Sequence, residues 1–126
     1  MEPIPKLEDI IKFYPEFDGV HPILECFPMI SPEDFWELVE HIRVNGVATN
    51  LMREKGTNLL IDGRARLLAL DITGSLFEVT DVDPEYVLAH VTASNLHAMQ
   101  FAKGEKEATK AKLMPFYKAQ SKRRAK

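Results

Sequence analysis

The fold is decided by residues 59–68, which read LLIDGRARLL. A short apolar run ends at Asp62-Gly63, and an apolar segment that opens with Arg64 follows directly. Glycine allows a tight backbone turn and lets a ligand approach the main chain closely. The stretch therefore predicts a strand, a turn at Gly63 and a helix that ends before Gly74.

The same turn carries groups that suit phosphate. The start of a helix presents unpaired N–H groups and the positive end of its dipole. Arg64 and Arg66 add forked donors that match phosphate oxygens. Spacing alone leaves two interpretations open: the arginines hold the phosphates of a nucleotide, or they pair with acids near the first helical turn.

Signals on both sides of this stretch extend the pattern into one domain. Ser31-Pro32 resembles a capping-box start, and Asn45-Gly46 is a typical helix end. The other expected elements are a short helix near residues 7–11, strands over 51–54, 58–61 and 76–80, a helix from Asp83 to about 95, and a last helix from Gly104 that Pro115 ends or kinks.

We expect three parts along the chain. Residues 1–20 form an arm that packs on the body or on a partner, residues 21–117 form the domain, and residues 118–126 form a basic tail. The single cysteine, Cys26, excludes an intrachain disulfide and a multi-cysteine zinc site, and it fits a buried position in a protein of the reducing cytoplasm.

Composition is that of an ordinary globular protein, with 126 residues, 45% hydrophobic and 28% charged. A membrane span needs roughly 20 apolar residues, and the apolar runs here are much shorter. The N-terminus does not read as a secretory signal. We therefore expect no contact with a membrane.

Charge is distributed unevenly. Residues 1–102 hold 7 Lys/Arg and 17 Asp/Glu, a net charge of −10, whereas residues 103–126 hold 9 Lys/Arg and 2 Asp/Glu, a net charge of +7. A basic tail on an acidic body indicates a polyanionic partner. Lys122, Arg123 and Arg124 are the candidate contacts to nucleic acid, and a solvated helix end is the alternative.

Most of the chain resembles the N-terminal domain of ParB-like proteins, within the ParB/sulfiredoxin superfamily, especially the short versions of phages and plasmids. The segments that carry this resemblance occur in the family's order with similar spacings: His21-Pro22, residues 27–31 (FPMIS), 40–47 (EHIRVNGV), 60–66 (LIDGRAR), 83–88 (DPEYVL) and 94–97 (SNLH). The resemblance implies an α+β fold with a small mixed β-sheet flanked by helices.

The resemblance also implies a nucleotide site. In ParB proteins this pocket binds CTP with magnesium, and ATP is the other nucleotide we consider. Residues 62–66 would hold the phosphates, Gly46 would border the base, and Asn95 with His97 would complete the pocket. No pair of histidines has metal-ligand spacing, so we predict no zinc site.

The sequence departs from the family pattern at residues that would bind metal and phosphate. Ser94 stands where partition proteins carry a metal-binding Glu, and Ala98 and Met99 replace basic residues. Losing a carboxylate weakens a magnesium site, so we expect hydrolysis to be affected more than nucleotide binding. For a kinase the upstream candidate base is Glu25.

Three functions follow. The first is a nucleotide-binding accessory protein of a mobile element, acting on DNA or on a DNA-bound partner in partition or regulation. The second is a protein-interaction inhibitor or regulator with a degenerate pocket, whose acidic surface mimics DNA. The third is a ParB-like nuclease, although the sequence lacks the clustered carboxylates of two-metal cleavage.

Overall fold

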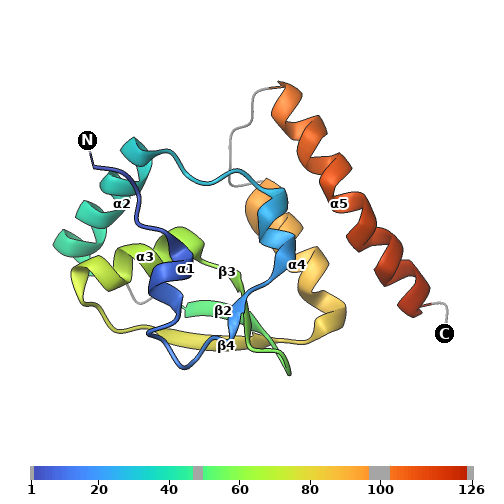
Figure 1. The fold of residues 1–126 in the computed structure, drawn as a ribbon, viewed down its shortest axis with the longest axis horizontal. Coiled ribbons are helices and arrows are strands. Elements are labelled where there is room, and N and C mark those ends of the chain that lie inside the picture. Colours follow the sequence, from blue (N-terminus) through green and yellow to red (C-terminus); the bar gives the residue numbers. More distant parts are fainter. Residues whose placement is uncertain (1, 47–49, 97–102, 125–126) are drawn as a thin grey trace.

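A computed structural model describes residues 2–46, 50–96 and 103–124 (Figure 1). Side chains are described within these ranges, except those of residues 94–96, 103–107 and 121–124. The elements in chain order are α1 (Leu7–Ile11), β1 (Gly19–Val20), the 3₁₀ helix η1 (Pro22–Cys26), α2 (Pro32–Asn45), β2 (Asn50–Glu54), β3 (Leu59–Asp62), α3 (Arg64–Thr73), β4 (Glu78–Val82), α4 (Pro84–Leu96) and α5 (Lys103–Arg124).

The four strands form one mixed sheet in the order β1-β3-β2-β4. Strands β2 and β3 are the expected antiparallel hairpin around a glycine turn. Strand β1 runs parallel to β3, and β4 runs parallel to β2. The predicted α+β class with a small mixed sheet flanked by helices is confirmed.

Helix boundaries follow the capping signals of the sequence. The Ser31 hydroxyl accepts a hydrogen bond from the Asp34 amide at 3.2 Å and caps the start of α2. Gly46 ends that helix with φ 65°, and Gly74 ends α3 in the left-handed conformation. The sequence therefore placed both helices correctly.

The N-terminal arm packs on the body and belongs to its core. Ile11 and Phe17 are buried in the same cluster as the strands, and the two residues of β1 join the sheet beside β3. Its predicted short helix is α1. The following helix η1 is held by His21, whose Nδ1 accepts a hydrogen bond from the Ile23 amide at 3.1 Å.

Strand β4 (Glu78–Val82) begins two residues later than the predicted strand over residues 76–80, so the predicted bounds were wrong. Leu76 is 93% exposed, and the ring of Phe77 packs beside Tyr14 and Phe17 ahead of the strand. Pairing with β2 then sets the start of β4 at Glu78, opposite Asn50.

The last helix continues past Pro115, so of the two outcomes predicted for this proline, an end or a kink, the end was wrong. Leu113 is buried and Phe116 is half-buried, and both pack on the core, which holds the helix on either side of the proline. Figure 1 shows α5 as one rod along η1 and α4. The expected tail from residue 118 is helical as far as Arg124.

Among the described helices none is long and apolar enough to cross a membrane. The core lies between the sheet and its helices. Its most deeply buried members include Phe35 of α2, Leu51 of β2, Leu60 and Ile61 of β3, and Leu67, Leu68 and Leu70 of α3.

Candidate functional site

The turn between β3 and α3 requires glycine. Gly63 has φ 95° and ψ 29°, in the left-handed region, and it is the N-cap of α3. A Cβ atom there would lie 2.5 Å from Cδ2 of Leu51, a fully buried residue of β2. No described side chain caps α3, so its first amides have no side-chain partner there.

Arg64 is the first residue of α3, and its side chain turns toward the segment before α2. Its Nη2 donates to the carbonyl oxygens of Phe27 at 3.3 Å and Pro28 at 3.4 Å. Burial lowers the pKa of the guanidinium, which still stays protonated at neutral pH. Within the described part of the chain no carboxylate lies within ion-pair distance of it.

Arg64 lines a cavity of about 600 Å³ between the N-terminal arm, β1 and η1. The walls are mostly apolar. Four charged side chains interrupt them: Lys6, Glu8, Glu25 and Arg64. The other lining residues are Ile4, Pro5, Leu7, Ile11, Gly19, Val20, Leu24 and Met29. The volume is that of a typical small-molecule site.

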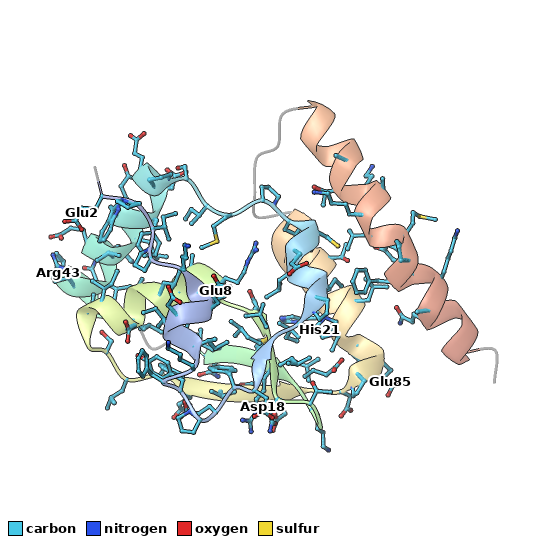
Figure 2. All side chains as sticks on the ribbon, viewed as in Figure 1. Glu2, Glu8, Asp18, His21, Arg43 and Glu85 are labelled. Carbon is cyan, nitrogen blue, oxygen red and sulfur yellow. The ribbon has the colours of Figure 1, made fainter. Side chains whose placement is uncertain are left out.

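Two candidates from the sequence, Arg64 and Glu25, thus face the same cavity. The cavity also contains residues that the sequence analysis missed, above all Lys6 and Glu8 of the arm. Nothing in the sequence pattern links residues 6–8 to the turn, because their proximity depends on α1 packing beside α3. Glu8 is labelled on α1 in Figure 2.

The side chain of Asp62, which precedes the Gly63 turn, contacts His90 of α4. Its Oδ2 lies 3.5 Å from Nε2 of His90, and both side chains are largely buried. That nitrogen is fully buried and has no hydrogen-bond partner among the described residues. Asn95 lies five positions after His90 on α4, about 7.5 Å further along the helix axis.

The remaining candidates are not among the described residues that line the cavity. Arg66 is exposed and does not line the cavity. Gly46 lies at the end of α2, and Figure 1 draws that end away from the start of α3. The Asn95 side chain and the whole of His97 lie outside the described part of the structure.

The candidate nucleic-acid contacts lie at the end of α5. Lys122, Arg123 and Arg124 belong to its last turn, although their side chains are not described. Earlier on the same helix, Lys112 and Lys118 are exposed. Residues 103–124 hold 8 Lys/Arg and 2 Asp/Glu, so the helix carries a net charge of +6.

Across the described side chains, no group of three His, Cys, Asp or Glu could hold a metal ion. The described carboxylate nearest to the turn, Asp62, faces His90. Comparison with known proteins gave no match to any family, to any curated protein or to any solved structure.

Proposed function

We propose that this chain is a ParB-like nucleotide-binding domain, in which the Gly63 turn and Arg64 hold the phosphates of CTP or ATP. The observation that carries the proposal is the state of Arg64. This cation is half-buried, its hydrogen-bond acceptors are two backbone carbonyls, and it faces a cavity of about 600 Å³. Buried charges in proteins are normally neutralised by a partner.

A phosphate would give Arg64 the directly paired anion that it lacks, although Glu8 and Glu25 also line the cavity. Arg64 would donate to the phosphate oxygens, and the first amides of α3, which no described side chain caps, are a second set of donors at the same turn. Lys6 lines the same cavity and adds a second cation. The apolar walls suit the base or sugar of a nucleotide, and the ordered ParB-like motifs agree with this ligand class. Magnesium would accompany the phosphates.

The test is calorimetric titration with CTP, ATP and their diphosphates, with and without Mg²⁺. We expect the wild-type chain to bind and Arg64→Gln to weaken binding about 10- to 100-fold, the range for one charge-assisted hydrogen-bonding group. Arg43→Gln is the matched control, because Arg43 pairs with Glu40 on the exposed side of α2 (Figure 2). Absence of binding at millimolar nucleotide would refute the proposal.

A role on DNA, as an accessory protein of a mobile element, is supported by α5. This helix is a continuous basic rod attached to an acidic body, which is the charge pattern of an element that contacts phosphates. We expect duplex DNA binding to weaken as salt rises. Replacing Lys112 and Lys118 by Gln removes two positive charges. The plot of log K against log salt should then be less steep, its negative slope smaller in magnitude by about 2.

The control for this measurement is the pair Lys12→Gln and Lys55→Gln, which removes the same charge from the acidic body. Both of these lysines are exposed and lie outside α5. Equal loss of affinity in the two double variants would mean that net charge alone governs the interaction. Absence of DNA binding at low salt would favour the alternative, a regulator that binds a basic protein through residues 1–102, whose net charge is −10.

A further inference from the structure

A hydrogen bond joins the start of the described chain to α2. The indole Nε1 of Trp36 donates to the carbonyl oxygen of Glu2 at 2.7 Å. The Trp36 ring is half-buried and meets Phe35 edge to face, with ring centroids 5.1 Å apart. Figure 2 shows Glu2 at the chain start, beside α2 and away from Glu8 on α1.

Between these two points the chain forms one wall of the Arg64 cavity. Ile4, Pro5 and Lys6 all line it, and Ile4 also packs against the core. The helix that follows, α1, has five residues, and within the described structure Lys6 does not cap it with its side chain. A helix of this length is not stable in isolation. It therefore depends on packing against the rest of the protein and on the contacts that hold residues 2–6 in place.

We propose that residues 2–6 are a strap over the Arg64 cavity and that Trp36 is the positioning residue that fastens it. The closed strap supplies the cavity with an apolar wall and with the charge of Lys6. A released strap would open that side of the cavity and take Lys6 away from Arg64. The ligand class in this inference rests on the proposed nucleotide function, whereas the fastening itself does not.

Hydrogen exchange of the full chain tests the fastening without a ligand. Trp36→Phe keeps an aromatic ring beside Phe35 but removes the N–H donor. Deleting Glu2 and Pro3 removes the acceptor and leaves Trp36 unchanged. In both variants we expect amides of residues 6–11 to exchange about three- to tenfold faster, the effect of losing one hydrogen bond.

The control is Tyr117→Phe, which removes a hydroxyl within hydrogen-bond distance of Thr92 on α4, at 3.4 Å. It should leave exchange in residues 6–11 unchanged. Because Trp36 is the only tryptophan, its emission should also shift to longer wavelength in the deletion variant, where water replaces the carbonyl. Unchanged exchange in both strap variants would overturn the proposal.

Titration with ATP and CTP then tests the strap as part of the site. If the wild type binds and Arg64→Gln binds about 10- to 100-fold more weakly, the nucleotide function stands, and we expect Trp36→Phe and Lys6→Gln each to bind several-fold more weakly than the wild type. Equal affinity in those two variants would show that the strap is no wall of the nucleotide site. If the wild type binds neither nucleotide, the proposed function fails, and the exchange rates alone decide whether the strap exists.

Discussion

The Cδ2 atom of Leu51 occupies the space that a side chain at Gly63 would need, since a Cβ there would lie only 2.5 Å away. Leu51 is fully buried on β2 and therefore cannot move aside easily. The hairpin strand β2 thus fixes which residue can stand at the turn before α3. The candidate phosphate turn depends in this way on the core beneath it.

Replacing Gly63 with Ala should destabilise the chain by about 2–4 kcal/mol, because overpacking adds to the cost of a positive φ. The measurement is urea unfolding at neutral pH. Gly56→Ala is the matched control, because Gly56 has the same φ of 95° and nothing within 4 Å of a Cβ. Equal losses in both variants would show that contact with Leu51 adds nothing.

A second prediction concerns Tyr14, whose hydroxyl donates to Oδ1 of Asp71 at 2.5 Å. Burial, helped by this hydrogen bond and the nearby charge, raises the pKa of Tyr14 from 10.0 to about 12. The folded chain therefore holds this proton more tightly than the unfolded chain. The resulting stability is fully present below pH 10 and is lost as the pH rises from 10 to about 12.

Tyr14→Phe should be less stable than the wild type at pH 8, by about 1 kcal/mol. The difference between the two chains should shrink as the pH is raised above 10, because ionisation of Tyr14 then favours unfolding of the wild type alone. Urea midpoints at pH 8, 9, 10 and 11 provide the comparison. A difference that stays constant across this series would contradict the assignment to Tyr14.

The third prediction uses Cys26 as a reporter of the contact between η1 and α5. This thiol is buried, burial raises its pKa, and its Sγ lies 3.4 Å from the carbonyl oxygen of Lys112. A protonated, covered thiol reacts slowly with disulfide reagents. Because Cys26 is the only cysteine, its modification can be followed directly by absorbance.

Leu113→Ala should speed modification of Cys26 by about tenfold or more, because it removes a core side chain that holds α5 in place. Met114→Ala is the control on the same helix, since Met114 is 49% exposed. It should leave the rate nearly unchanged. A fast reaction in the wild type, equal to that of the unfolded chain, would show that α5 does not cover Cys26.

Local sequence determined most helices and the strand–turn–helix at Gly63. Capping residues such as Ser31 and stop glycines such as Gly74 act within a few positions, so their effects can be read along the chain. The sequence also indicated Arg64 and Glu25 as candidates. The sequence could not show whether Arg64 pairs with an acid or stays available to phosphate, because this depends on which segments pack around α3.

Tertiary structure decided the rest. It brought residues 4–8 to the Arg64 cavity and set Asp62 against His90, contacts between segments that no periodicity relates. It also carried α5 past Pro115, because packing of Leu113 and Phe116 outweighs one missing backbone hydrogen bond. Local propensity acts over one turn, whereas burial against distant segments contributes more free energy and so selects the final arrangement.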